Sequence, residues 1–384
     1  MIRVALKMLV GDLAKYLGMI FGVGFACFLI CQQLSIFAGL MSRTFGFIAD
    51  TAYPDVWVMD EKVQFVDDLK PLQDTMLYRV RGQDGVAWAS PMYKGLIKAR
   101  LADGTFQNAI VVGIEDATLI GGPPKMIEGK IEDLRRADSV IIDDVGRREK
   151  LAKTNPDGTT TPLEVGDTIE LNDRRAVVVG ICEVSRTFQS QPVIYTTYSR
   201  ATTFAPRERK LLTFILVGAK PTTTPKELAD QLGQINGLSA YTQDEFSKLT
   251  LDYIMKNTGI PINFGISTLL GLIVGTAVVG MTFYQFTSDN LKHLGALKAM
   301  GAGNLRLTAM TLAQATVVAL LGFGIGVGGA GLMGVSLGQS ELAFRMLWQI
   351  PVFCAVAVFG ICWLAALLSL IRIFRLEPGI VFRA

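Results

Sequence analysis

A short polar and basic segment, TSDNLKHLGALKAMGAGNLR at residues 287–306, lies between two long apolar runs and holds the chain's only histidine, His293. The flanking runs, 257–288 and 307–340, contain no Asp, Glu, His, Lys or Arg. Each exceeds the roughly 20 residues that an α-helix needs to cross the hydrocarbon core of a bilayer. The segment is therefore expected to be a turn, at one membrane surface, between two transmembrane helices.

Two further uncharged runs, at 16–42 and 346–371, are also long enough to span a membrane. The chain is 50% hydrophobic and 18% charged, whereas a soluble domain carries about a quarter charged residues. Its charges crowd into one central region. We therefore predict an α-helical membrane protein with four transmembrane helices and a large α+β extracytoplasmic domain inserted between helices 1 and 2. The expected boundaries are 16–42, 257–288, 307–338 and 346–371 for the helices and 43–256 for the domain.

The orientation follows from Lys and Arg in the short flanks of the spans, because cytoplasmic loops carry an excess of these residues. We expect both termini, the segment 289–306 and the tail 372–384 in the cytoplasm, in a multi-pass protein of the inner (plasma) membrane. The basic residues that support this orientation are Arg3, Lys7, Lys15, Lys292, Lys298, Arg306, Arg372, Arg375 and Arg383.

The first fifteen residues have a pattern of their own. Leu6, Leu9, Leu13 and Leu17 recur at helical spacing, and basic residues share another face. This pattern predicts a cytoplasmic amphipathic helix over 1–15 that lies on the inner membrane surface. The alternative is that these residues simply begin the first span.

The central region alternates between strand and helix patterns. VAWASPMYKGLIKARL and FQNAIVVGIED flank Asp103-Gly104 and predict a β-hairpin, and residues 163–184 predict two strands about Asn172-Asp173. TPKELADQLGQI at 224–235 predicts a helix with Thr224 as its N-cap. Further strands are expected at 55–60, 139–144 and 210–219, and a further helix at 71–86.

The chain lacks the residues that several classes of function need. The outer domain has no histidine and no GxSxG motif, so no catalytic constellation is found, and Asp143-Asp144 is interpreted as a strand end. The net charge of +3 suggests no nucleic-acid partner. Cys27 and Cys31 are one helical turn apart, but no other ligand is near in sequence, so we favour helix packing over a metal site. No metal or directly bound cofactor is expected.

The third span contains LLGFGIGVGGAGLMG, which includes literal GxGxxG matches. A dinucleotide-binding fingerprint needs a preceding strand and a following amphipathic helix, and here the whole stretch is apolar. Small residues four apart instead let a second helix approach closely. We therefore predict helix-packing roles for Gly322, Gly324, Gly326, Gly328, Gly334 and Gly338.

No Walker-type segment occurs in the chain: EGKIED at 128–133 has Gly-Lys but lacks the upstream Gly and the following Ser or Thr of a P-loop. Any ATP that drives this protein must therefore be hydrolysed by another chain.

The layout of one helix, an outer domain and three further helices resembles the FtsX-like, MacB-type (type VII) family of ABC transporter permeases, with the closest resemblance to the DevC type. Motif similarity covers about the last third of the chain, and the outer domain matches by layout. The segments that carry the resemblance are TGIPINFGISTLLGLIVG (258–275), FYQFTSDNLKHLGALKAMGAGNLRL (283–307), LLGFGIGVGG (320–329) and LEPGIVFRA (376–384).

The resemblance implies a permease that works as a homodimer with a cytoplasmic ABC ATPase, which would bind ATP and Mg. It also implies that the substrate is handled at the outer leaflet or in the periplasm, and that a membrane fusion protein and an outer-membrane channel are partners. The expected function is export or extraction of a lipid-like or hydrophobic substrate. The sequence identifies neither the substrate nor the partner proteins.

The segment 289–306 is then expected to couple the permease to its ATPase. On a helix, Asp289, Lys292 and His293 would share one face. Many relatives carry an acidic residue where this chain has His293, and Asp289 is the candidate to supply that charge. The residues assigned to ATPase coupling are Asp289, Lys292, His293, Leu294, Gly295, Leu297, Lys298 and Gly301, with Gly301 and Gly303 ending the helix. The alternative is a solvated loop.

Two other functions remain open at this point. An FtsX-like regulator of envelope enzymes would share the same layout. A membrane receptor that displays the outer domain would explain one anchor helix but not the three further helices. An intramembrane enzyme or ion-coupled transporter is disfavoured, because the spans contain no ionisable Asp, Glu, His, Lys or Arg.

Overall fold

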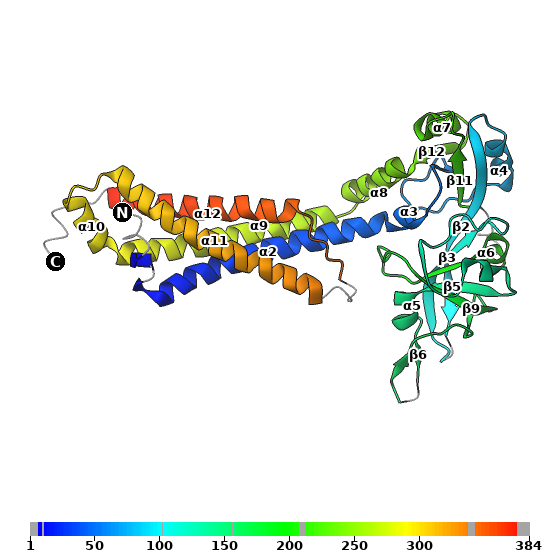
Figure 1. Cartoon of the computed structure of the whole chain (residues 1–384), viewed down its shortest axis with the longest axis horizontal. Helices are drawn as coiled ribbons and strands as arrows, with labels where there is room; N and C mark the ends of the chain where they lie inside the picture. Colours follow the sequence, from blue (N-terminus) through cyan, green and yellow to red (C-terminus); the bar gives the residue numbers. More distant parts are fainter. Residues whose placement is uncertain are drawn as a thin grey trace. The chain divides into compact units, whose positions relative to one another are not determined.

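The computed structural model divides the chain into a helical unit and an α+β unit, each with its own core (Figure 1). The helical unit comprises Met1–Leu40 and Gly259–Ala384, and the α+β unit comprises Met41–Thr258. The residues that the structure describes are 7–9, 11–101, 103–155, 157–206, 212–336 and 342–374.

The helical unit contains four long helices and one short one. The long helices are α2 (Leu13–Thr44), α9 (Ile260–Asp289), α11 (Asn304–Ser336) and α12 (Gln349–Phe374), and the short helix α10 (Leu291–Ala299) joins α9 to α11. All four long helices have the length and apolar composition needed to cross a membrane. With the large α+β unit inserted between α2 and α9, the predicted fold class is confirmed.

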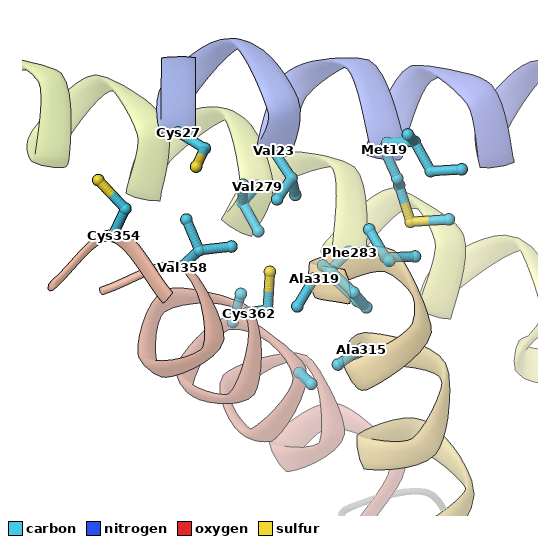
Figure 2. Close-up of a cluster of buried hydrophobic side chains, with 14 of the residues drawn as sticks. Met19, Val23, Cys27, Val279, Phe283, Ala315, Ala319, Cys354, Val358 and Cys362 are labelled. Atoms are coloured by element: carbon cyan, nitrogen blue, oxygen red, sulfur yellow. The ribbon is translucent and has the colours of Figure 1, made fainter. Parts of the chain in front are cut away.

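The core of the helical unit combines small and sulfur-containing side chains with larger apolar ones such as Phe283 and Phe286. Figure 2 shows Val23 and Cys27 of α2, Val279 of α9 and Cys354 of α12 around this core. Helix α12 packs against both α9 and α11. Close packing of this kind holds helices together where lipid removes the hydrophobic driving force.

The α+β unit is built on a ten-stranded sheet in the order β12-β1-β11-β2-β3-β10-β5-β9-β4, with β8 paired to β2 and β9. Because β8 pairs with both, strands β2, β3, β10, β5, β9 and β8 form a closed circuit. The strands are β1 (Val56–Asp60), β2 (Val86–Arg100), β3 (Phe106–Ile114), β4 (Lys125–Glu128), β5 (Ser139–Asp143), β8 (Thr168–Leu171), β9 (Arg174–Glu183), β10 (Val193–Thr197), β11 (Phe214–Ala219) and β12 (Leu238–Thr242). A separate hairpin joins β6 (Lys153–Thr154) to β7 (Thr160–Thr161).

The long strand β2 belongs to both halves of this sheet. Its first part, up to Met92, pairs with β11, and its second part, from Tyr93, pairs with β3. The helices of the unit are α3 (Gly46–Asp50), α4 (Asp74–Arg81), α5 (Asp144–Arg148), α6 (Tyr198–Phe204), α7 (Pro225–Leu232) and α8 (Gln243–Asn257), with a 3-10 helix η1 (Ile131–Arg135).

Several local predictions for this unit are confirmed. The β2–β3 hairpin turns beside Asp103-Gly104, and β8–β9 turns at Asn172-Asp173. The hydroxyl of Thr224 accepts a hydrogen bond from the backbone N–H of Glu227, as an N-cap does. Asp143 ends β5, and its carboxylate caps α5 by accepting from Gly146 N.

The first residues differ from the amphipathic helix predicted over 1–15, because the helix is interrupted at Asp12. Helix α2 begins at Leu13, and Asp12 caps it by accepting a hydrogen bond from Lys15 N at 3.3 Å. Leu9 is buried in the core of the helical unit, whereas Leu13 and Leu17 are exposed. The break at Asp12 therefore lies inside the helix predicted over 1–15. Leu6 lies outside them.

Candidate functional site

The candidate coupling segment folds as the short helix α10, which ends in a well-formed glycine cap. Gly301 has a φ of +92°, in the left-handed region that favours glycine. Its N–H donates to the carbonyl of Lys298 at 3.1 Å, and the N–H of Ala302 donates to the carbonyl of Leu297 at 3.0 Å. This pair of bonds is the Schellman motif. The predicted helix end at Gly301 is thereby confirmed, and Gly303 begins the next helix by accepting from Arg306 N.

One face of α10 is packed against the long helices. Leu294 is buried in a small cluster with Ala302, Leu307 of α11 and Leu370 of α12. The partly buried side chains that join this cluster are Leu291, Leu297 and Met8. Gly295 is also buried. Helix α10 is therefore fixed to α11 and α12 by apolar contacts.

The opposite face of α10 is polar. Lys292 and His293 are both exposed, and Lys298 is partly buried. Two of the three residues predicted to share a face, Lys292 and His293, are therefore both exposed on α10. An exposed basic face on a packed helix is suited to electrostatic contact with another protein.

Asp289 does not belong to this face, in contrast to the prediction. It is the last residue of α9, and its carboxylate lies 2.7 Å from the Nζ atom of Lys15. Lys15 also pairs with Asp12 at 2.8 Å, and this hydrogen bond lowers the pKa of the Asp12 carboxyl. The sequence prediction assumed one continuous helix through Asp289, but α9 ends there and Asn290 separates it from α10. The role of Lys15 was missed, because residues so distant in sequence give no pairing signal.

Two of the predicted packing glycines allow α11 to approach α2. A Cβ atom added at Gly322 would lie 2.5 Å from Cγ1 of Val23, and one at Gly326 would lie 2.5 Å from Cβ of Cys27. One at Gly334 would lie 2.3 Å from the ring of Phe344. Cβ atoms at Gly324 and Gly328 would meet nothing within 4 Å among the described residues, so close packing is not seen at these two positions. Gly338 lies outside the described residues.

The described part of the chain holds no group of three or more His, Cys, Asp or Glu side chains that could bind a metal ion. Cys27 and Cys31 are buried in the core of the helical unit. Helix α10 thus combines a packed apolar face at Leu294 with the exposed side chains of Lys292 and His293.

The fold and this segment define the class of protein: a membrane protein with four spanning helices, a large inserted domain and a short helix between the second and third spans. Residues 16–235 match the family model of the MacB-like periplasmic core domain, and residues 265–378 match the FtsX-like permease C-terminal model. The chain therefore belongs to the FtsX/MacB-type family of ABC transporter permeases. Membership implies a multi-pass protein of the inner membrane and a cytoplasmic ATPase partner.

Similar proteins agree with this assignment. Two uncharacterized ABC transporter permeases of Mycobacterium tuberculosis, from strains CDC 1551 / Oshkosh and H37Rv, are each 25% identical over 321 residues. Each alignment covers 81% of this chain and 79% of the relative.

Solved structures of outer domains are also similar. The extracellular domain of the noncanonic ABC-type transporter YknZ from Gram-positive bacteria matches with a TM-score of 0.34 and 15% identity, over 49% of this chain and 99% of that one. The periplasmic region of MacB from Actinobacillus actinomycetemcomitans matches with a TM-score of 0.37 and 15% identity, over 54% and 95%.

Proposed function

We propose that this chain is the permease subunit of an ABC exporter. It transmits ATP hydrolysis by a partner ATPase to the extracytoplasmic domain and so drives export or extraction of a lipid-like or hydrophobic substrate. The observation that carries the proposal is the division of α10 into a packed face at Leu294 and an exposed basic face at Lys292 and His293.

A helix can transmit a displacement only if it is attached firmly at its other side. Leu294 contacts a cluster that includes Leu307 of α11 and Leu370 of α12. The glycine cap at Gly301 fixes the direction in which the chain enters α11. A push on the exposed face would therefore reach two long helices at once.

The proposal also includes an orientation in the membrane and further partner proteins. The basic flanks support a cytoplasmic location for α10 and both termini. We expect a homodimer with ATP and Mg bound on the ATPase, and a membrane fusion protein and outer-membrane channel, as the resemblance to DevC-type permeases implies.

Co-purification tests the proposal. The full chain would be expressed with an ABC ATPase encoded beside it, and the ATPase retained by the tagged permease would be measured. We expect Lys292→Glu combined with His293→Glu to reduce retention by about tenfold or more, the effect of losing one contact to a charged group. Lys62→Glu is the matched control, because Lys62 is an exposed lysine of the α+β unit. A permease that is stable and retains no ATPase would contradict the proposal.

A further inference from the structure

A buried lysine lies where β2 exchanges one partner strand for another. Lys94 follows the switch from β11 to β3 by two residues, and its side chain is only 3% exposed. The backbone of Lys94 is fixed by Thr213, whose hydroxyl accepts from Lys94 N at 3.1 Å. A charged side chain in such a position is retained only when it is well paired.

Three groups surround the ammonium of Lys94. It donates to the carbonyl of Val66 at 3.1 Å, forms an ion pair with Asp67, and lies 4.4 Å from the centre of the Phe47 ring. Burial lowers the pKa of Lys94, and the Asp67 carboxylate opposes that shift. The ammonium N–H groups of Lys94 are therefore occupied by contacts within the protein.

The loop that carries Val66 and Asp67 is itself held by α8. The N–H of Val66 donates to the hydroxyl of Thr250 at 3.2 Å, and the rings of Phe65 and Tyr253 stack with centres 4.5 Å apart. Both contacts fix the loop 61–71 beside Lys94. The position of Asp67 is thus built by the fold, although its own side chain is 44% exposed.

A cavity of about 190 Å³ opens beside this ion pair. This volume suits one compact molecular group. Its polar lining includes the half-exposed Asp67 with Lys94, Thr187, Gln189 and Gln191, and its apolar lining includes Leu69, Leu96 and Ile110.

The polar lining of the cavity offers a ligand both a hydrogen-bond acceptor and hydrogen-bond donors. One oxygen of Asp67 accepts from Lys94, so the other can accept from a ligand. The Oε1 atom of Gln191 accepts from Gln107 Nε2 at 3.2 Å, so its own amide N–H groups can donate. A group that both donates and accepts, as a hydroxyl does, satisfies both partners.

We propose that this cavity binds the head of a neutral amphiphile that carries hydroxyl groups, with the adjoining carbon chain on the apolar side. The assignment rests on the proposed export of lipid-like molecules. Lys94 balances the charge of Asp67, so a ligand can donate a hydroxyl hydrogen bond to Asp67 without carrying a positive charge. A cationic head would lie near the Lys94 ammonium, and an anionic head would lie against the Asp67 carboxylate, because Lys94, which also lines the cavity, is already paired with Asp67.

Cysteine protection tests this site on the full chain, without the ATPase. All five native cysteines are buried, so a cysteine introduced by Leu96→Cys is the position expected to react with a maleimide. Leu96 is 43% exposed at the cavity. The probes share one six-carbon acyl or alkyl chain: 1-hexanoylglycerol is neutral with two hydroxyls, hexanoate is anionic and hexylamine is cationic.

We expect 1-hexanoylglycerol to slow labelling at position 96 and the two charged probes to protect far less. Adding Gln191→Ala should weaken the protection by about fivefold, the effect of one lost hydrogen bond. Ile127→Cys is the matched control, because Ile127 is 50% exposed on β4 and does not line the cavity.

Absence of protection at position 96, equal protection at position 127, or equal protection by a charged probe would each overturn the assignment. These outcomes leave the proposed exporter function untouched, because that function is tested separately by retention of the ATPase.

Discussion

The ammonium of Lys15, near the start of α2, lies 2.7 Å from the carboxylate of Asp289, the last residue of α9. The pair therefore joins the beginning of the first long helix to the end of the second. Both side chains are about half exposed, at 44% and 52%, so solvent screens the attraction and its contribution to overall stability is small. Its importance would lie in holding two helix ends together.

Breaking this pair should affect coupling more than folding. Asp289→Asn is expected to leave the melting temperature nearly unchanged and to reduce stimulation of the ATPase by the permease. The charge-swapped double variant Lys15→Asp with Asp289→Lys should recover part of that stimulation. A double-mutant cycle on ATPase rates, built from Lys15→Asp, Asp289→Lys and the swapped double variant, measures the interaction. Additive effects of the two single changes would exclude a direct role for the pair.

The glycine cap of α10 gives a second prediction. Gly301→Ala places a side chain at a φ of +92°, which costs about 1–2 kcal/mol for a non-glycine residue. We expect a lower melting temperature and weaker ATPase stimulation. Gly303→Ala is the matched control, because Gly303 is not among the residues with positive φ and a Cβ there would meet nothing within 4 Å. Equal effects at both positions would contradict the role of the cap.

Packing of α11 on α2 gives a third prediction. Gly326→Leu would force a side chain into Cys27 and the carbonyl of Gly24, since even a Cβ would lie 2.5 Å and 2.7 Å from them. Overpacking of this kind costs about 1–3 kcal/mol or more. The variant should give less folded protein by size-exclusion chromatography and a lower melting temperature. Gly328→Leu in the same helix should leave the fold of the single chain intact, because a Cβ there meets no described neighbour within 4 Å.

Acid dependence of the α+β unit gives a fourth prediction. Burial raises the pKa of Asp143 to about 6, against an unfolded value of about 3.9. The folded state then binds this proton more tightly than the unfolded state, so Asp143 contributes most stability at low pH and loses it as pH rises from about 4 to about 6. A shift of about two units corresponds to about 3 kcal/mol.

Hydrogen exchange of the amides in β5 and α5, followed against pH, measures this dependence. Wild-type protein should lose protection relative to Asp143→Asn across that interval. A constant difference between the two proteins from pH 4 to about pH 7 would show that Asp143 has the same pKa in the folded and unfolded states.

Much of the fold could be predicted from local patterns in the sequence. The four spans follow from uncharged runs, and the hairpin at Asp103-Gly104 follows from turn chemistry between two alternating stretches. The N-cap at Thr224 needs only neighbouring residues. In each case the feature is determined by residues that are close together in the sequence, so a local pattern is enough to predict it.

The features that the sequence did not predict depend on contacts between distant residues. β10 pairs in parallel with β3 at one edge and antiparallel with β5 at the other. Nothing in the five-residue sequence of β10 indicates which strands it pairs with. The pair Lys15–Asp289 and the contacts of Lys94 likewise join separate elements. The amphipathic helix over 1–15 was predicted by counting helical spacing through Asp12, where the structure interrupts the helix.

The central claim is that the exposed face of α10 contacts the ATPase, and site-directed cross-linking tests it most directly. Because the native cysteines are buried, Lys292→Cys in the full chain supplies one reactive thiol for a short heterobifunctional cross-linker. In membranes that contain the ATPase, we predict a cross-linked product whose yield changes when ATP is added. Lys62→Cys should give no such product. Equal yields from both positions, or no product from Lys292→Cys with an ATPase that co-purifies, would contradict the account.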